Sequence, residues 1–455
     1  MSFELTKPLL AGIQEDVAEG RDRAVQDLLK ELHPSDIGAI LDRLDLEEAV
    51  YVYRLLEHEE AAEVLLELED DRREELLGSL TSREIAEDVL EHIDSDDAAD
   101  VMAELPEEKQ REVIALLDDQ EQREDLEELL TYPEGTAGAL MGKEMISVRA
   151  DSSVARAIVE MRRQAQEVEH VYTIYVVDKD ERLIGILQFK DLLFSAESTR
   201  TLIKHIADTD VVSVRVDTDV EEVVLLMKKY DVVVLPVVDA DNKLVGRITF
   251  DDVMDVMTEE ASEDYQLASG ISEDVDAMDS PMVQVRARLP WLLIGLAGGI
   301  LSSQIIGRFE GQLRIDPTMA FFMPLIAATA GNVGVQSSAI VVQGLASGML
   351  QRVNILARIW KELRVAVITA LVCGLLIFAV NLALDQSQAL TYTVSIALFT
   401  VIITAAIFGT IIPLVMDRLK VDPALATGPF VTTLNDIFGL LTYFTVGHLM
   451  YDLFK

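Results

Sequence analysis

The segment Ala424–Tyr451, ALATGPFVTTLNDIFGLLTYFTVGHLMY, is long enough to cross a bilayer and carries a carboxylate, Asp436, near its middle. An ionisable side chain at that depth is costly, so it indicates an ion or substrate path. Thr432, Thr433 and Asn435 add oxygen ligands within about one helical turn of it. The alternative is a carboxylate that hydrogen-bonds between helices and fixes their packing.

Four more apolar segments lie between Arg288 and this one, and together they predict five membrane spans. They are Leu289–Ile306, Met319–Leu345, Val365–Leu384 and Leu390–Met416. With the N-terminus inside, basic residues concentrate on the cytoplasmic flanks, which places the C-terminus outside. The cytoplasmic flanks hold Arg286, Arg288, Arg352, Arg358, Lys361, Arg364, Arg418 and Lys420. The outer flanks hold Arg308, Arg314 and Lys455.

The second span contains a run of small and polar residues, Gly331–Ser338, with the sequence GNVGVQSS. Glycines let helices approach closely or let backbone carbonyls face a cavity, and Asn332 and Gln336 share one helical face. One interpretation is a helix-packing seam. Because Asp436 lies in another span, a water-lined cation path is the interpretation that covers both segments.

Charge divides the chain. The full sequence has 38 Lys+Arg and 80 Asp+Glu, and residues 281–455 hold 11 and 8 of them, so residues 1–280 carry a net charge of −45. Such an acidic region excludes nucleic acid as a partner and suits attraction of cations, although simple solubility is an alternative. The one cysteine, Cys373, excludes disulfides within the chain. The N-terminal sequence lacks a basic region followed by an apolar core, so we expect no secretory signal and a cytoplasmic acidic region.

The first 130 residues have helical periodicity and contain four similar strings at spacings of 24, 24 and 13 residues. The strings are Asp36–Leu41, Glu60–Leu65, Glu84–Val89 and Asp97–Met102. They predict short helices stacked as a right- or left-handed solenoid, which is typical of an interaction surface. Most of its carboxylates form a solvated face, but Asp96 and Asp100 lie one turn apart and could share a divalent ion.

Residues 141–256 contain a strand-and-helix pattern that occurs twice. Ile174–Asp178 corresponds to Leu235–Asp239, and each copy then enters a helix, at Asp191 and Asp252. The two copies resemble the paired CBS domain, an α/β module that senses adenine nucleotides or ions. In the second copy Thr249 and Asp252 match the family's pattern for phosphate and ribose contacts.

The first copy has Gln188 in place of that hydroxyl, with Lys190 and Asp191 as its candidate nucleotide ligands. The resemblance therefore favours ATP or a related adenine nucleotide at the second copy. The alternative is that both acids belong to helix N-caps.

A solenoid, a CBS pair and five C-terminal spans in this order resemble the MgtE family of magnesium channels along nearly the whole chain. Three motifs carry the resemblance: Tyr132–Met141 at the junction, Gly331–Gln336 in the second span, and Val421–Ala424 with Thr433–Asp436 in the fifth. Val333 and Gly428 depart from the residues common there. The implied division is 1–131 helical domain, 132–203 and 204–256 CBS domains, 257–285 connecting helix and 286–455 pore domain.

The resemblance implies a homodimer whose pore lies on the twofold axis and is lined by the second and fifth spans. A twofold axis would place two Asp436 carboxylates around one ion. Mg2+ holds its water tightly, so paired carboxylates would grip the hydrated ion through its waters. The further candidate ligands around this path are Gly331, Asn332, Thr432 and Asp422.

The acidic stretch Asp255–Tyr265 corresponds to a connecting helix that closes the cytoplasmic mouth in the resembled family. Its carboxylates would repel those of the solenoid and of the CBS pair unless divalent ions bridge them. High cytoplasmic Mg2+ would therefore compact the domains and shut the pore; the alternative is a generic acidic linker. The candidate sensor ligands are Asp231, Asp252, Asp255, Glu259, Glu263, Asp264 and Asp422, with Asp96 and Asp100 from the solenoid.

The sequence thus predicts a magnesium channel of the inner or plasma membrane, gated by cytoplasmic Mg2+ and modulated by ATP. No motif offers a nucleophile with a base or a phosphate-cradling loop, so no enzyme is expected. Two alternatives stay open: a transporter of another divalent cation such as Co2+ or Mn2+, and a membrane-tethered nucleotide or ion sensor that conducts nothing.

Overall fold

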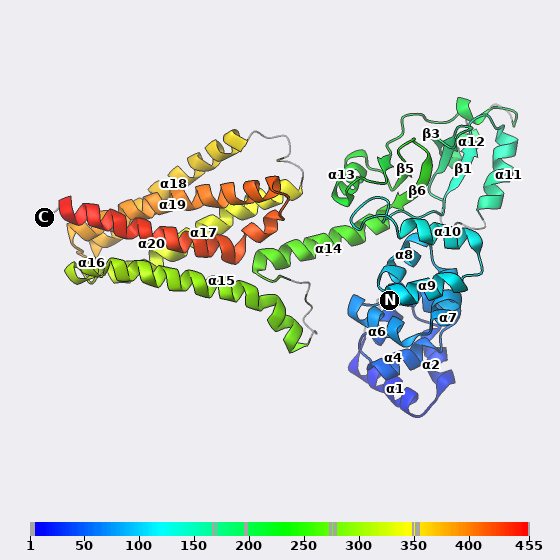
Figure 1. Cartoon of the computed structure of the whole chain (residues 1–455), viewed down its shortest axis with the longest axis horizontal. Coiled ribbons are helices and arrows are strands. Elements are labelled where there is room, and N and C mark those ends of the chain that lie inside the picture. Colours follow the sequence, from blue (N-terminus) through cyan, green and yellow to red (C-terminus); the bar gives the residue numbers. More distant parts are fainter. Residues whose placement is uncertain are drawn as a thin grey trace. The chain divides into compact units, whose positions relative to one another are not determined.

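A computed structural model describes residues 5–165, 168, 171–194, 199–272, 275, 280–347, 350 and 355–453. It divides into two compact units, Met1–Val256 and Met257–Lys455 (Figure 1). The finer five-part division expected from the sequence stays a prediction.

Short helices build the first part of the first unit. They are α1 (Lys7–Ala18), α2 (Asp22–Leu29), α3 (Pro34–Leu41), α4 (Leu46–Tyr53), α5 (His58–Leu66), α6 (Asp70–Ser79), α7 (Ser82–Glu84), the π-turn η1 (Ile85–Val89), the 3-10 turn η2 (Leu90–His92), α8 (Ser95–Ala103), α9 (Glu107–Leu116) and α10 (Gln120–Leu129). Capping boxes start two of them, Asp45 with Glu48 at α4 and Thr81 with Glu84 at α7.

The repeated strings explain how these helices stack. They occupy α3, α5, the α7–η1 turn and α8, and helices two apart along the chain pack together, as α3 does with α5 and α4 with α6. The apolar positions of each string, such as Ile37, Leu65 and Val101, are buried in one continuous core. The predicted array of stacked short helices is therefore confirmed.

Two three-stranded sheets with the same topology follow. The first contains β1 (Ile146–Arg149), β2 (Ile174–Val177) and β3 (Leu183–Leu187), and the second contains β4 (Val214–Arg215), β5 (Val234–Val238) and β6 (Leu244–Thr249). In each sheet the middle strand pairs parallel with the first and antiparallel with the third. Their helical elements are α11 (Val154–Gln164), α12 (Phe189–Phe194), η3 (Ile203–His205) and α13 (Val220–Tyr230).

The two copies are buried in different cores. The first copy has a core of its own around Ile146, Ile174 and Val176. The second copy shares its core with the helical domain, because Leu126 and Met141 pack in the same cluster as the second copy's strands. This shared core places the second copy against the end of the helical array.

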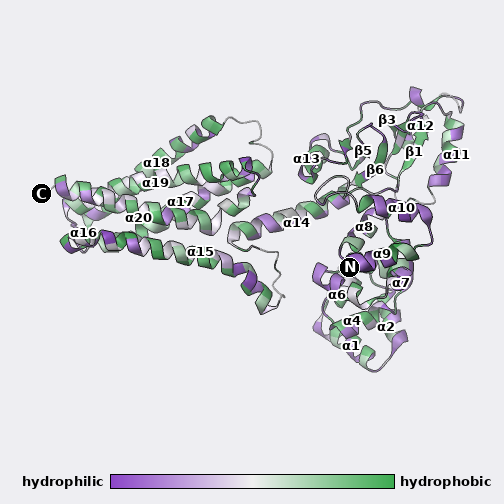
Figure 2. Cartoon of the chain, viewed as in Figure 1, coloured by the Kyte–Doolittle hydropathy of each residue, from purple (hydrophilic) through white to green (hydrophobic). Residues whose placement is uncertain are grey.

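The second unit is built from long helices, in which green, hydrophobic residues predominate in Figure 2. Its elements are the end of α14 (Phe250–Ser269), α15 (Pro281–Arg308), α16 (Glu310–Ile315), α17 (Met319–Ala346), α18 (Ile355–Ala383), α19 (Gln388–Arg418), η4 (Pro423–Ala426) and α20 (Gly428–Leu453). Among the described residues, four helices are long and apolar enough to cross a membrane: α15, α17, α18 and α19.

Helix α20 is long enough but less apolar, because Asn435 and Asp436 interrupt its hydrophobic run. It nevertheless packs against α15, α17 and α19 as part of the same bundle. Two helices begin well before the expected spans, α15 at Pro281 and α18 at Ile355. Both extensions carry basic residues, which favour helix without favouring the hydrocarbon region.

Candidate functional site

The carboxylate of Asp436 lies where α20 packs against α17. A methyl group added to Gly331 would lie 3.6 Å from Oδ1 of Asp436 and 3.0 Å from Cγ2 of Thr432. Asp436 is partly buried, and the Thr432 hydroxyl donates to the Gly428 carbonyl of its own helix at 2.9 Å. Three of the predicted pore residues, from two helices, therefore come together.

The two faces of α17 differ in character. Gly331, Gly334 and Ser337 lie on its buried face, whereas Asn332 and Gln336 lie on a face that the chain itself leaves exposed. The packing-seam interpretation therefore describes the glycines. Two exposed amides on an apolar helix instead require water or another protein surface within the membrane.

Asn435 has a different environment from Asp436, although the two are neighbours in sequence. It is 2 % exposed, and neither of its side-chain amide atoms has a hydrogen-bond partner. A methyl group on Gly334 would overlap its Nδ2, at 1.8 Å. Asn435 thus packs onto the α17 backbone at the buried seam, and the sequence did not distinguish this from a ligand position.

A pair of acids lies near the start of α20. Partial burial, with the Asp422 carboxylate beside it, raises the pKa of Asp264 above its usual range. Oδ1 of Asp422 accepts from the backbone N–H of Ala424 at 2.7 Å and caps η4. Glu259 and Glu263 are exposed on the same helix as Asp264. Two of the predicted sensor ligands, Asp264 and Asp422, are therefore neighbours.

The end of α14 also touches the start of α20. Gly428 has φ of +53°, and a side chain there would place its Cβ 2.3 Å from the carbonyl oxygen of Ala268. Glycine is required at this position on both counts. Gly428, which replaces an Asn seen in some members of the resembled family, thus lies at a close backbone contact.

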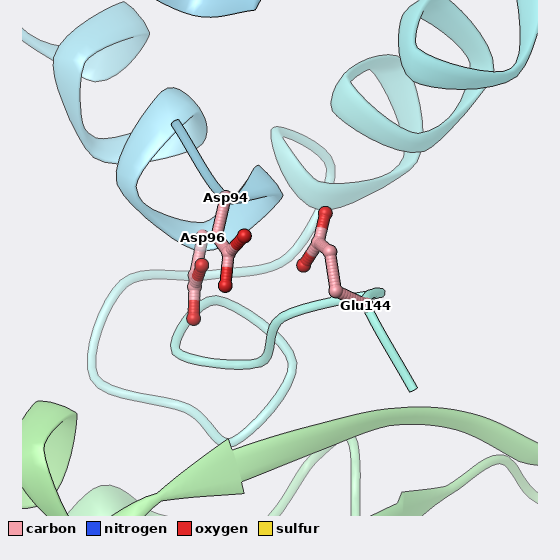
Figure 3. A group of neighbouring side chains, drawn as sticks. All are labelled: Asp94, Asp96 and Glu144. Carbon is pink, nitrogen blue, oxygen red and sulfur yellow. The ribbon is translucent and has the colours of Figure 1, made fainter. Parts of the chain in front are cut away.

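In the first unit a group of three carboxylates could hold a metal ion (Figure 3). Asp94 and Asp96 come from the start of α8, and Glu144 comes from the segment that precedes β1. One oxygen from each lies within 4.8 Å of the others. Ser95 orients Glu144, because its backbone N–H and its hydroxyl both donate to that carboxylate at 3.0 Å.

The electrostatics of this group suit a divalent cation. Burial, together with repulsion from Asp252 and the neighbouring acids, raises the pKa of Asp96 well above its usual range and that of Asp97 to about 7. Burial and Asp94 also raise the pKa of Glu144. Crowded carboxylates of this kind release protons when a hard cation with oxygen preference binds.

The structure brings some predicted sensor residues to this group and leaves others outside it. Asp252 is close enough to perturb Asp96, and Asp255 has its own pKa raised by partial burial, then by Asp252. Asp100 is exposed on α8, and Asp231 is exposed at the left-handed C-cap of α13.

Sequence reasoning missed Asp94, Asp97 and Glu144. The available signal was the run Asp94-Ser95-Asp96-Asp97 at a helix start, where several carboxylates converge on one helix end. Glu144 lies 48 residues beyond Asp96 in the chain, and periodicity carries no information about such a contact.

The two CBS copies differ at their candidate nucleotide residues. In the second copy the backbone N–H and hydroxyl of Thr249 donate to Oδ2 of Asp252 at 3.0 and 2.5 Å, which caps α14. In the first copy, Gln188, Lys190 and Asp191 line a cavity of about 310 Å³. In the second copy Thr249 and Asp252 therefore bond each other, whereas in the first copy the candidate residues line a cavity.

The fold and the site define a class: a multidomain membrane protein with acidic domains and a carboxylate within its helical bundle, suited to divalent cations. The MgtE divalent cation transporter profile matches residues 323–446, and the MgtE intracellular N domain matches 32–135. CBS domains match 137–197 and 203–259. The magnesium transporter MgtE of Thermus thermophilus is 35% identical over 451 residues, which cover 98% of this chain and 100% of that protein. The chain belongs to the MgtE family of divalent cation transporters.

Two further proteins are similar to this chain. The magnesium transporter MgtE of Bacillus subtilis is 35% identical over 318 residues, 70% of each chain. A solved structure of the cytosolic domain of the Mg2+ channel MgtE in complex with ATP is 41% identical; it covers 54% of this chain and 99% of its own, with a TM-score of 0.49.

Proposed function

We propose that this chain forms a magnesium channel of the inner or plasma membrane, with its ion path along α17 and α20. One observation carries the proposal: Asp436 lies beside the bare backbone of Gly331, and Asn332 and Gln336 stand on an uncovered face of the same helix. Membership of a divalent cation transporter family supports cation transport over catalysis.

The uncovered face supports a pore shared by two copies. Exposed amides in a bilayer need water or a partner surface. A second copy related by a twofold axis would provide that surface and enclose a water-filled path between the two copies. Two Asp436 carboxylates on that axis would hold a hydrated Mg2+ through its waters, with Gly331, Asn332 and Thr432 adding oxygens.

Gating by cytoplasmic Mg2+ is the second part of the proposal. Residues 1–280 carry a net charge of −45. Neighbouring carboxylates already repel each other at two places: Asp264 beside Asp422, and Asp96 near Asp252. Mg2+ that bridges such carboxylates would cancel their repulsion and stabilise the compact, closed arrangement. The N-terminal domains would then lie in the cytoplasm and the C-terminus outside, as the basic flanks favour.

Binding of an adenine nucleotide such as ATP is the third part of the proposal. The cavity lined by Lys190 and Asp191 supports the first CBS copy as its site, with a cation for phosphate and a carboxylate for a ribose hydroxyl. The Thr249–Asp252 pair in the second copy stays a weaker candidate, because each of these side chains already bonds the other.

The decisive test is Mg2+ flux into proteoliposomes that contain the purified chain, with internal Mg2+ varied. Flux that falls as Mg2+ rises on the cytoplasmic face supports both conduction and gating. Flux of Co2+ or Mn2+ without Mg2+ would support the first alternative, and absence of any flux would support a sensor that conducts nothing.

A further inference from the structure

A second carboxylate, Glu362, is buried inside the membrane unit and has no place in the ion path described above. It lies in α18 and is 7 % exposed. Its Oε1 accepts a hydrogen bond from the hydroxyl of Ser337 in α17 at 2.7 Å. Its Oε2 lies 3.7 Å from Nη2 of Arg358, one turn earlier on α18. Glu362 precedes the expected span Val365–Leu384, but a buried carboxylate still requires an explanation because its desolvation is costly.

The partner of Glu362 belongs to the helix that carries the exposed amides. Ser337 is five residues after Asn332, so the two side chains point about 140° apart around the axis of α17. The Ser337 hydroxyl is therefore directed into the bundle when Asn332 and Gln336 are directed out of it. A bond at Ser337 fixes the rotation of α17 about its own axis.

On the same face, glycines of α17 pack closely against α19 and α20. Gly331 and Gly334 meet Thr432 and Asn435 of α20, and the carbonyl oxygen of Gly334 would lie 2.3 Å from a Cβ on Gly409 of α19. Glycine surfaces permit close approach but also permit a helix to turn or slide. The hydrogen bond from Ser337 to Glu362 is directional, so it adds a rotational restraint to the glycine packing.

We propose that Glu362 is a positioning residue, which holds α17 through Ser337 so that Asn332 and Gln336 face the ion path. The guanidinium of Arg358 lies 3.7 Å from the other carboxylate oxygen of Glu362 and supports its position. The proposal rests on the proposed function only for its transport readout, because the orientation of α17 can be measured separately.

Thiol labelling measures that orientation in the full-length chain. Cys373 is the one cysteine in the sequence, so a Cys373→Ser background followed by Gln336→Cys gives a single reporter on the exposed face. The protein is reconstituted in proteoliposomes and treated with a membrane-impermeant methanethiosulfonate reagent. In this background the reporter should react quickly because it lies on the water-lined face.

Removal of the restraint should slow that reaction. We expect Ser337→Ala to lower the labelling rate about threefold, the effect of one average interhelical hydrogen bond in a membrane, and Glu362→Met to lower it further. Glu362→Gln keeps an acceptor for the Ser337 hydroxyl, so it should label faster than Glu362→Met. Thr329→Ala is the matched control, because the Thr329 hydroxyl donates to the Leu325 carbonyl of its own helix at 2.7 Å.

Unchanged labelling in both Ser337→Ala and Glu362→Met would overturn the proposal, as would an equal loss in Thr329→Ala. A purely structural role would lower the yield or thermal stability and leave the rate of the folded fraction unchanged. Mg2+ flux of the Cys373→Ser protein without the Gln336→Cys reporter separates the two proposals: altered labelling together with no flux in that protein refutes the channel, and flux in that protein together with unaltered labelling refutes the positioning role.

Discussion

Asp436 and Gly331 lie so close that a methyl group on the glycine would be 3.6 Å from Oδ1 of the carboxylate. The acid of α20 therefore meets the bare backbone of α17. Because the two residues are 105 positions apart in sequence, the bundle itself creates the arrangement.

Replacement of this carboxylate should stop conduction. We expect Asp436→Ala and Asp436→Asn each to lower Mg2+ flux in proteoliposomes by on the order of a hundredfold or more, since the variants remove charge from the ion path. Asp385→Asn is the matched control, because Asp385 is exposed in the connection between α18 and α19 and has φ of +53°, which Asn tolerates. Normal flux in Asp436→Asn would refute its role.

The space beside Gly331 should be equally sensitive. Gly331→Ala places a methyl group 3.0 Å from Cγ2 of Thr432, so we expect displacement of Thr432 and a flux loss of about tenfold. Gly299→Ala in α15 is the control, since nothing lies within 4 Å of its added methyl group. Similar flux in both variants would contradict a narrow site at Gly331.

The acidic group in the first unit predicts a pH dependence. Folding raises the pKa of Asp97 from 3.8 to about 7, so the folded state binds more protons between these values. Without metal, the free energy of unfolding should therefore fall as pH rises through this window. Mg2+ should reverse that loss, and its stabilising effect in thermal unfolding should be larger at pH 8 than at pH 5, because fewer protons must be displaced.

A matched pair of variants tests whether the stabilising Mg2+ binds at the Asp94, Asp96 and Glu144 group. Glu144→Gln should reduce the Mg2+-dependent rise in Tm, whereas Glu134→Gln, at an exposed position, should preserve it. An identical Mg2+ response in the two variants would place the sensor ions elsewhere.

The nucleotide site can be assigned by calorimetry on the full chain. We expect Asp191→Ala to weaken ATP binding more than Asp252→Ala does, because Asp191 lines a cavity while Asp252 caps a helix. This order is the reverse of the one that the Thr-x-x-Asp pattern predicts. Asp180→Ala, at an exposed turn, serves as the control, and a larger effect at Asp252 would restore the sequence-based assignment.

Protease cleavage can follow the connecting segment. Cleavage within Glu259–Asp264 should be fast without divalent cations and slow at millimolar Mg2+, since bridging ions remove the repulsion between Asp264 and Asp422. Potassium at matched ionic strength should protect much less. Equal protection by both salts would mean simple screening and would remove the ion-sensing role.

Sequence patterns predicted most of the fold because its elements are locally encoded. The repeated strings identified α3, α5 and α8, the duplicated strand pattern identified both sheets, and apolar length identified the membrane helices. Helix ends were less predictable: α15 and α18 continue beyond their apolar runs, where hydropathy gives no signal.

The candidate site was predicted only in part, for a physical reason. Asp436 was singled out because an acid is unusual in a span, and Gly331 because it begins a run of small and polar residues. Glu144 and Ser337 are ordinary residues in their local sequence, and their significance arises from contacts with distant segments. Neighbours in sequence can also diverge, since Asn435 packs into a helix seam while Asp436 faces Gly331.

The contact between Gly428 and the carbonyl of Ala268 has a mechanical consequence. Helix α20 runs from Gly428 to Leu453, and Asp436 lies eight residues along it, about 12 Å from the contact. No proline interrupts the helix between Phe430 and Asp436. An unbroken helix of this length moves largely as a rigid body, so a shift of the connecting segment at Gly428 would be transmitted along α20 to the carboxylate.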